Sequence, residues 1–400
     1  MQTTPQNSTT SSRLYLAFDL GGSSWKLGFA TEPAGRPHHR SVAVKNRNAP
    51  EILEAVFAEI AAAKSRFRLP NDAPVSSCYE AGRDGFWLDR ALRAEDVSNV
   101  IVDPASVLVN RRARRAKTDR LDVESLLGSL FRHQAGEKVW RVVRVPSAED
   151  EDLRRLPRDR ENLVKQRTRH TNRIKGVLVL EGVGKLDARP LSPRFEEALE
   201  RIRRFDGSPL GDRQLQVIRD EVARLRLVQN QIKRIDDEHK RLLTTKQPIG
   251  STLEKAQRLT QLRGIGPVGA MILVTEFYGW REFKNRRQVG ALAGLTDSPW
   301  KSDGIDKQQG ISKAGNYRIR RLAVELAWGW VTQWQVGSEL AKWFHGQTGT
   351  GKKRLKRVAI VAVARKLLVA LWHYLDHGVV PAGAVFKPSR CLVRAKAKTA

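Results

Sequence analysis

The sequence predicts an α/β domain followed by a largely helical remainder. Apolar segments of strand length alternate with helical patterns up to about residue 135, whereas two long charged segments follow from about Ala148. A further region with helical spacing runs from Lys255 to about Leu375. We therefore expect a disordered leader at 1–12 and an α/β domain at 13–147. We expect long helices at 148–250, a mainly helical domain at 251–380 and a basic tail at 381–400.

The elements of the α/β domain are predicted from apolar runs and turn residues. The glycine pair 21–22 turns the chain between the first two strands, and Thr118 is placed as the N-cap of the last helix. The expected strands are 14–19, 25–30, 41–44, 75–79 and 97–102. The expected helices are 51–67, 86–93 and 118–131. This order of elements is that of a ribonuclease-H-like α/β domain.

The long charged segments, 149–180 and 215–243, flank a stretch that contains Pro and Gly. In the second segment apolar residues such as Val222, Leu225 and Val228 recur every three to four positions. This predicts paired long helices that could form a coiled coil, although the heptads are too irregular to fix a register. A solvated helical linker is the alternative.

The charge of the chain points to an anionic partner. Its 400 residues include 72 Lys and Arg against 43 Asp and Glu, a formal net charge of +29. A folded protein tolerates that self-repulsion when something anionic neutralises it, and the commonest partner is a nucleic-acid backbone. A solvated basic surface or a ribosome-associated protein is the alternative. Hydrophobic residues make up 40% of the chain, which excludes wholesale disorder.

The composition also favours a cytoplasmic protein with no membrane partner. Cys78 and Cys391 lie far apart and lack histidines at ligand spacing, which argues against a disulfide framework or structural zinc. The polar leader shows no signal peptide. The longest apolar stretch, 358–372, is interrupted by Arg365 and Lys366, and we expect it to be too short and too charged to span a membrane.

Four carboxylates carry the candidate chemistry. Asp19 ends one apolar strand and Glu80 ends another, while Asp119 and Asp122 stand three residues apart on one face of a helix. Such a cluster can hold divalent cations through oxygen ligands, and two ions about 4 Å apart can activate a nucleophile and stabilise a leaving oxygen in phosphodiester chemistry. Each acid alone could be structural: Asp19 could cap a turn, and Asp122 could pair with an arginine.

A cationic run precedes and overlaps the helix with the last two acids. Arginines beside carboxylates would bring a phosphate backbone toward the acidic pocket. A solvated basic loop is the alternative. The members of the run are Arg111, Arg112, Arg114, Arg115, Lys117 and Arg120.

The segment from Asp19 to Lys26 also resembles the first phosphate loop of sugar kinases and actin-like ATPases. In those proteins Gly-rich backbone amides cradle phosphate. They need a second Gly-rich loop of similar type, and this sequence has no convincing one. A net charge of +29 is also unusual for a metabolic kinase.

Two features mark the C-terminal region. Gly264-Ile-Gly-Pro267 resembles the turn of a helix-hairpin-helix module, where glycine amides and a helix N-terminus meet a DNA phosphate; an ordinary tight turn is the alternative. Further on, a polar, Gly-flanked loop and its surroundings hold Ser298, Ser302 and Ser312 near lysines and arginines, where a hydroxyl could attack phosphorus. The residues alone do not rank these serines, and any of them could be a turn residue.

Together these motifs resemble the DEDD-type insertion-sequence transposases of the IS one-hundred-ten family. The N-terminal part matches in Phe18-Asp19, Tyr79-Glu80-Ala-Gly82, Asp103-Pro104 and Lys117-Thr-Asp119-Arg-Leu-Asp122. The C-terminal part matches in Gly264-Ile-Gly-Pro267, Gly294-Leu295, Ser302 and Gly310-Ile-Ser-Lys-Ala-Gly-Asn316. The Lys-Thr-Asp-x-x-Asp and Gly-Ile-Ser-Lys-x-Gly-Asn strings, in this order in one chain, make the resemblance very specific.

The resemblance implies a RuvC-type domain whose acids Asp19, Glu80, Asp119 and Asp122 bind Mg²⁺, with Mn²⁺ as a substitute. It implies a C-terminal transposase domain in which Ser302, by its position before the Gly-Ile-Ser-Lys string, forms a phosphoserine link to cleaved DNA. Family members work as dimers or tetramers, and a structured bridge RNA pairs with donor and target DNA. Besides the cationic run, the expected nucleic-acid contacts are Gly264, Gly266, Lys301, Lys313, Asn316, Arg318, Arg320 and Arg321.

Two departures from the family pattern concern the serine loop. Asp303 follows Ser302 where the family has glycine, and Asp297 stands in place of a proline that here comes two positions later. Both leave the choice between Ser302 and Ser298 open. Two rival functions are also considered: a non-catalytic nucleic-acid-binding protein whose acids are structural caps, and a junction-resolving nuclease that uses water on the same acids.

Overall fold

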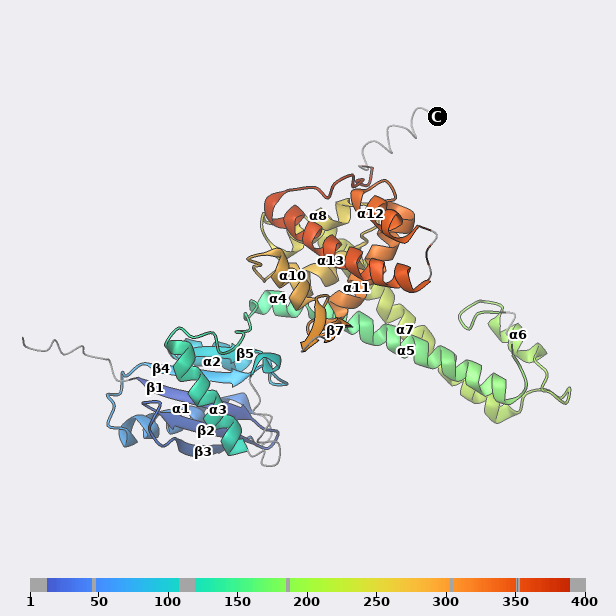
Figure 1. Ribbon diagram of the computed structural model, residues 1–400. Helices are drawn as coiled ribbons and strands as arrows, with labels where there is room; N and C mark the ends of the chain where they lie inside the picture. Colours follow the sequence, from blue (N-terminus) through green and yellow to red (C-terminus); the bar gives the residue numbers. More distant parts are fainter. Residues whose placement is uncertain are drawn as a thin grey trace, which may run out of the picture. The chain divides into compact units, whose positions relative to one another are not determined.

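The structure, a computed structural model, divides the chain into two compact units at residues 145 and 146 (Figure 1). Each unit has its own hydrophobic cores. The structure describes residues 13–44, 48–107, 119–184, 188–302, 305–349, 351 and 353–388, and it describes their side chains except at 105, 119 and 300–308.

The first unit is built on a five-stranded sheet in the order β3-β2-β1-β4-β5. The strands are β1 (Leu14–Leu20), β2 (Ser24–Ala30), β3 (His38–Ala43), β4 (Val75–Glu80) and β5 (Ser98–Val102). The first three strands pair antiparallel, whereas β4 runs parallel to β1 and β5 runs parallel to β4. The predicted α/β class is thereby confirmed; β3 begins at His38, earlier than expected.

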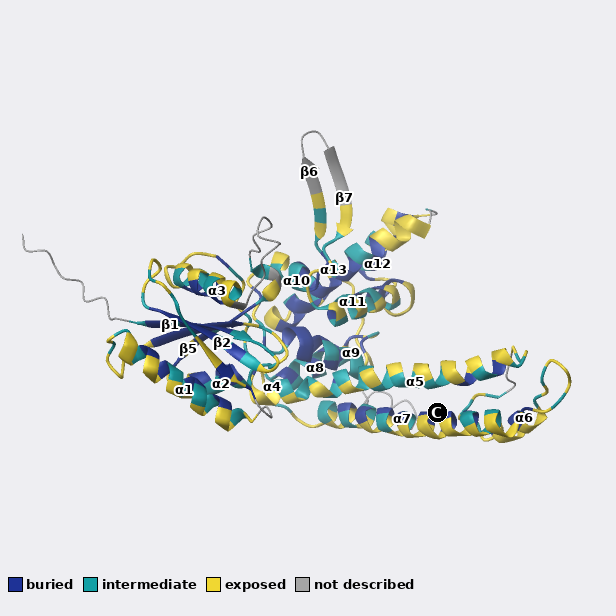
Figure 2. Ribbon diagram, turned by 90° about the horizontal axis from the view of Figure 1, so that it is seen from below, coloured by how far each residue is buried: buried dark blue, intermediate teal, exposed yellow. Residues whose placement is uncertain are grey.

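Helices cover both faces of this sheet. They are α1 (Ala49–Arg66), α2 (Trp87–Ala94) and α3 (Asp119–Gln134), with a short 3₁₀ turn, η1, at Pro104–Ser106. Helices α1 and α2 share one core with Leu14, Leu16 and Phe18 of β1, whereas α3 shares the opposite core with Ala17. This alternation along β1 is what a strand buried on both faces requires, and Figure 2 shows its buried residues in dark blue.

The second unit is mainly helical. Its first helices are α4 (Ala148–Leu153), α5 (Arg155–Leu180), α6 (Phe195–Arg201) and α7 (Asp212–Thr244). They are followed by α8 (Thr252–Gln261), α9 (Pro267–Leu273), a π-helical turn η3 (Val274–Tyr278) and α10 (Arg286–Leu292). After a two-stranded hairpin come α11 (Tyr317–Gly329), a second π-helical turn η4 (Trp330–Trp334), α12 (Glu339–Thr348) and α13 (Lys353–His377).

Helices α5 and α7 lie side by side as a long antiparallel arm (Figures 1 and 2). Arg160, near the start of α5, donates to Asp236, near the end of α7, over 2.6 Å between Nε and Oδ1. Near the other end, Leu178 of α5 packs in one core with Ile218 and Val222 of α7. The expected pairing of two long helices is confirmed, while a coiled-coil geometry stays a prediction.

Helix α13 lies in the core of the C-terminal part. Its residues Val363, Leu367 and Leu371 are fully or almost fully buried and pack in the same core as α8, α11 and α12. With 25 residues and a mean hydropathy of 1.7 in its most apolar window, α13 is long and apolar enough to cross a membrane. Length and composition therefore do not exclude a span, contrary to the expectation. Burial of 56% of that window inside the unit is typical of a core helix.

The segment expected to be a serine-bearing loop is a β-hairpin. Strands β6 (Asp297–Ser302) and β7 (Ile305–Ile311) pair antiparallel, with Ser302 opposite Ile305. The polar sequence lacks the apolar alternation that marks a half-buried strand, which is why the loop interpretation was wrong. A register shift follows Asp297, and Gly310 on the partner strand has a φ of +87°, the left-handed conformation that glycine adopts at such bulges.

Candidate functional site

The sheet of the first unit brings Asp19 and Glu80 to one edge. Strands β1 and β4 are parallel neighbours, with Ala17 opposite Cys78 and Phe18 opposite Tyr79. Because side chains alternate along a strand, Asp19 lies on the face of Ala17 and Glu80 lies on the face of Cys78. Ala17 and Cys78 belong to the core that α3 covers. Both carboxylates are therefore on the α3 side of the sheet, near the carboxyl ends of parallel strands.

Helix α3 begins with the other two acids. Its residues Val123, Leu126 and Leu130 pack on the sheet. Positions 119 and 122 lie four residues before Val123 and Leu126, so they continue the same stripe one turn toward the N-terminus. The helix approaches closely at Gly28, where an added Cβ would lie 2.3 Å from Cγ1 of Val123. Local packing thus directs the start of α3 toward the face that carries Asp19 and Glu80.

The metal site itself stays a prediction. Among the side chains that the structure describes, no three His, Cys, Asp or Glu residues are close enough to hold an ion. The Asp119 side chain is not among the side chains that the structure describes. The donor chemistry nevertheless suits a hard divalent cation, because all four predicted ligands offer carboxylate oxygens.

Most of the cationic run lies outside the described residues: Arg111, Arg112, Arg114, Arg115 and Lys117. Arg120 is described, and its Nε donates to Glu124 Oε1 over 3.0 Å. Glu124 also bonds His39 over 2.9 Å. Arg120 is largely exposed, so this pair is weak and leaves the guanidinium accessible to phosphate.

In the second unit, the hairpin places the three candidate serines differently. Ser302 ends β6 opposite Ile305, the first residue of β7, so Ser302 and Lys301 lie at the end of the hairpin farthest from its base. Ser298 stands at the register shift near the base. Ser312 follows β7, and its Oγ accepts a hydrogen bond from Thr296 over 3.3 Å. Ser312 is thus part of the turn at the hairpin base.

The Gly-Ile-Ser-Lys-Ala-Gly-Asn string holds the base of this hairpin. The backbone N–H groups of Ser312, Lys313 and Asn316 donate to the carbonyls of Thr296, Gly294 and Leu292. Gly315 has a φ of +141°, and an added Cβ would lie 2.4 Å from the Leu292 oxygen. The string therefore binds the chain that leaves β7 to the chain that enters β6.

The expected nucleic-acid contacts on α11 make bonds within the protein. Asn316 caps α11 by accepting from the N–H groups of Arg318 and Ile319. Arg320 donates to the Lys313 carbonyl over 2.9 Å, and Arg318 donates to Glu161 over 2.6 Å. Arg321 is 3.8 Å from the same carboxylate, and its side chain is far more exposed than that of Arg318.

A buried carboxylate that the sequence did not single out lies beneath this string. Glu276, in η3, is 1% exposed and accepts two hydrogen bonds from Arg158 of α5, at 2.6 and 3.1 Å. Asn316 donates to Glu276 Oε2 over 3.0 Å, and Arg154 lies 3.6 Å away. Burial favours a higher pKa, but Arg158, Arg154 and Asn316 outweigh it and lower the pKa of Glu276 below its ordinary value.

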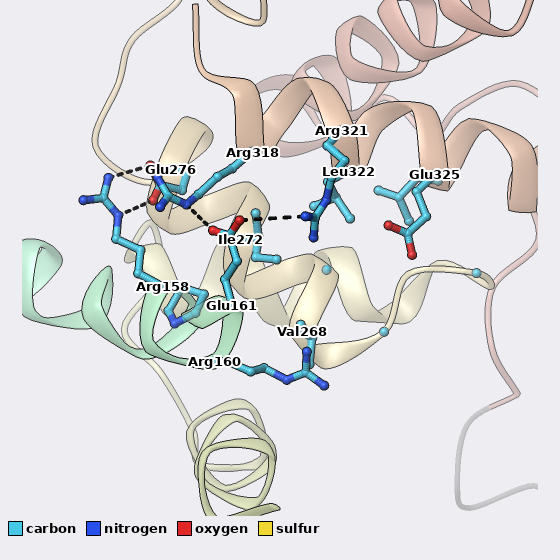
Figure 3. A pocket seen from close by; sticks show the side chains of 15 residues that line it. Arg158, Arg160, Glu161, Val268, Ile272, Glu276, Arg318, Arg321, Leu322 and Glu325 are labelled. Atoms are coloured by element: carbon cyan, nitrogen blue, oxygen red, sulfur yellow. Dashed lines mark hydrogen bonds and ion pairs between the residues drawn. The ribbon is translucent and has the colours of Figure 1, made fainter. Parts of the chain in front are cut away.

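Figure 3 shows the Arg158–Glu276 pair of this network beside a cavity of about 300 Å³. The cavity is bordered by α5, α9, α11 and the glycine turn. Glu161 projects from α5 toward Arg318 and Arg321 of α11, so two acids, Glu161 and Glu276, join the arm, the π-turn and the start of α11.

The Gly264–Gly266 turn connects α8 and α9 as expected. Gly264 has a φ of +98°, and an added Cβ would lie 2.9 Å from the Trp334 side chain. Gly266 is the N-cap of α9, with Pro267 following it. Lys387, from the predicted basic tail, donates to the Ile265 and Thr260 carbonyls over 2.7 Å, and burial lowers the pKa of its ammonium. This part of the tail therefore secures the turn.

A basic surface that the sequence reasoning missed begins α13. Between Glu339 and Asp376 the sequence has no acidic residue. The exposed cations at the start of α13 are Lys353, Arg354, Lys356 and Arg357. The long run without acids could have indicated this basic surface. It was missed because the apolar half of α13 dominates the same stretch of sequence.

Comparison with known proteins identifies both parts of the chain. Residues 38–181 match the DEDD transposases of IS110 type, and residues 256–343 match the Transposase IS116/IS110/IS902 family. The chain is 40% identical to y4rJ of Sinorhizobium fredii, named as a transposase, over 383 residues, 94% of each chain. It is 26% identical to y4qE of the same organism over 74% of each chain. It is 32% identical to the Yersinia enterocolitica transposase for insertion sequence element IS1328, over 32% of this chain and 37% of that protein.

An α/β domain with acids at one sheet edge, joined to a C-terminal transposase region, defines an enzyme that cleaves and transfers DNA strands. Enzymes of the DEDD class usually use a divalent metal. The chain belongs to the IS116/IS110/IS902 family of transposases.

Proposed function

We propose that the chain is the transposase of an insertion sequence and that it cleaves and rejoins donor and target DNA through a phosphoserine intermediate. The main support is the acid arrangement of the first unit. Asp19 and Glu80 share one sheet face, and the stripe of α3 that covers this face begins at positions 119 and 122. Acids gathered in this way in a member of a DEDD family suit phosphodiester chemistry better than separate structural caps do.

Ser302 is the proposed nucleophile, with Ser298 as the alternative. Its Oγ attacks a DNA phosphorus and loses its proton, while the bond from phosphorus to one deoxyribose oxygen breaks and that oxygen takes up a proton. The new phosphoserine ester replaces the phosphodiester that was lost, so attack by a DNA hydroxyl can reverse the step without an external energy source. The position of Ser302 at the end of β6, away from the bonded base, supports this choice.

Asp19, Glu80, Asp119 and Asp122 are the proposed ligands of Mg²⁺, or of Mn²⁺ in its place. The bound ion would neutralise charge that develops on the phosphate oxygens. The cations Arg111, Arg112, Arg114, Arg115, Lys117 and Arg120 would hold the DNA backbone beside the acids.

The partners that we propose are donor DNA, target DNA, a structured bridge RNA and further copies of the chain. The net charge of +29 and the basic start of α13 support extended contact with nucleic-acid backbones. Backbone contacts carry little sequence information, so base pairing with the RNA would select the site. The arm of α5 and α7, as a coiled coil, is a suitable element for a homodimer or tetramer.

The test compares two serines on one strand. Ser302→Ala and Ser298→Ala proteins receive a labelled duplex carrying the end of the element, with the transcript of its flanking non-coding segment and Mg²⁺. We expect Ser298→Ala to form a covalent protein–DNA adduct that survives denaturation, and Ser302→Ala to form none. Adduct with Ser302→Ala would refute the assignment.

A second variant, Asp19→Asn, tests the acids. We expect it to lower the cleavage rate by at least about 100-fold at equal DNA binding. Cleavage by wild type without an adduct would indicate a junction-resolving nuclease. Binding without divalent-ion-dependent cleavage would indicate a non-catalytic protein.

A further inference from the structure

The buried carboxylate of Glu276 is an unusual feature of an otherwise apolar segment. The segment from Ala270 to Tyr278 is buried almost throughout, and Glu276 and the neutral Thr275 are its buried polar residues. A buried charge is costly unless it is paired and hydrogen-bonded, and here Arg158 binds both carboxylate oxygens. Glu276 also stands in a π-helical turn, a local irregularity that often occurs at functional sites.

Asn316 connects this carboxylate to the hairpin. Its Oδ1 accepts from two N–H groups at the start of α11, while its Nδ2 donates to Glu276 Oε2. With the amide oxygen engaged by the helix and the amide nitrogen by Glu276, the side chain of Asn316 has one defined orientation. Its backbone N–H also donates to the Leu292 carbonyl over 2.9 Å, four residues before Thr296 at the entry to β6.

An isolated two-stranded hairpin has little stability of its own, so its orientation depends on its base. The base of β6 and β7 is bound to residues 312–316, and these end at Asn316. Glu276 therefore contacts the last residue of the segment that orients the strand carrying Ser302.

We propose that Glu276 is a positioning residue for transposition: by binding Asn316 and the two arginines it holds the hairpin base so that Ser302 approaches the DNA phosphate in one orientation. This inference rests on the proposed function of Ser302. Asn316 then has two roles: it caps α11, and it links Glu276 to the base of the hairpin.

The decisive experiment reverses the hydrogen bond between residues 276 and 316. Asn316→Asp keeps a good N-cap but places a carboxylate against Glu276. Glu276→Gln keeps the shape but removes the charge. In the double variant, the new amide at position 276 can donate to the new carboxylate at position 316, and one negative charge again faces Arg154 and Arg158. Glu325→Gln is the matched control, because Glu325 lines the same cavity and is exposed.

The measurement is the single-turnover rate of adduct formation by the full chain at saturating labelled duplex, with the DNA concentration at half saturation recorded separately. We expect Asn316→Asp to lower the saturated rate about 30-fold and Glu276→Gln about 10-fold, with half saturation changed less than about 2-fold. The double variant should return to within about 3-fold of wild type, a rescue that general destabilisation does not produce. Glu325→Gln should match wild type.

Wild-type rates in both single variants, or a double variant no faster than Asn316→Asp, would overturn the inference. If Asn316→Asp does not fold, the comparison of Glu276→Gln with Glu325→Gln decides it. Amide hydrogen exchange separates this inference from the proposed function. If wild type forms no serine adduct, the function fails, whereas unchanged exchange at residues 312–319 in Glu276→Gln shows that the positioning role fails.

Discussion

The predicted metal ligands and the proposed nucleophile of this transposase stand on different kinds of structure. Asp19 and Glu80 stand on central strands of a five-stranded sheet that has a core on both faces. Ser302 stands on a two-stranded hairpin whose described bonds to the rest of its unit are concentrated at its base. The strands that carry Asp19 and Glu80 are held rigidly because many apolar contacts on both faces of the sheet fix their position. The hairpin depends on a few polar contacts, so single substitutions at the base should affect it disproportionately.

The largest effect that we predict is at Gly315. An alanine there would place Cβ 2.4 Å from the Leu292 oxygen, a backbone atom, at a φ of +141°. We expect Gly315→Ala to destabilise the second unit by about 3 kcal/mol and to abolish adduct formation. Gly346→Ala is the control, since an added Cβ there meets nothing within 4 Å. Calorimetry of the full chain measures the stability of both variants, and hydrogen exchange assigns any loss to one unit. A stable, active Gly315→Ala protein would contradict the conclusion that the hairpin depends on a few contacts at its base.

The corresponding test of the first unit is Gly28→Val. The Cβ alone would lie 2.3 Å from Cγ1 of Val123 and 3.0 Å from Cδ1 of Leu127, so α3 must move away from β2. We expect a loss of about 2 kcal/mol in the first unit. Cleavage should also need a higher Mg²⁺ concentration for half its maximal rate, because the start of α3 carries two of the predicted ligands.

The control for this variant lies on the same helix. An added Cβ at Gly128 meets nothing within 4 Å, so Gly128→Ala should stabilise α3 by about 0.5–1 kcal/mol. Urea unfolding of both variants measures the difference. Equal effects of the two would show that α3 is not tightly packed at Gly28.

Sequence patterns predicted the sheet and its acids far better than the hairpin and its base. Strand β1 is apolar up to Asp19, and β4 is a short run of small and apolar residues that ends at Glu80, so the sequence itself marks both strands and their carboxylates. Glu276 was missed because its partners Arg158 and Asn316 lie 118 and 40 residues away, and no local pattern records such a pairing. A lone glutamate within an apolar run was the available signal. The hairpin was missed because its strands are polar and one includes Pro299.

A smaller effect is predicted for the arginine that binds Glu276. Lysine at 158 offers a point charge in place of a planar fork, so only one of the two oxygens keeps a short bond. Because Arg158 is partly exposed, we expect Arg158→Lys to cost only about 1 kcal/mol and to slow adduct formation about 5-fold. Arg160, on the same helix as Arg158, forms a similar fork with Asp236 of α7, so Arg160→Lys breaks a fork that does not include Glu276. Equal slowing by both variants would assign the effect to the arm as a whole.

The smallest effect concerns pH and His239 at the end of α7. Its ring is fully buried, neither nitrogen has a hydrogen-bond partner among the described residues, and burial lowers its pKa despite the nearby Asp236. Because the folded-state pKa is lowered, the unfolded chain takes up a proton on this histidine below about pH 6.5 before the folded chain does, so stability falls as the pH falls below about 6.5. His239→Leu should remove this slope and should stabilise the unit at every pH, because no unbonded nitrogen is then buried. Urea unfolding at about pH 5, 6, 7 and 8 measures the slope; the same slope in His239→Leu would assign the pH dependence to other groups.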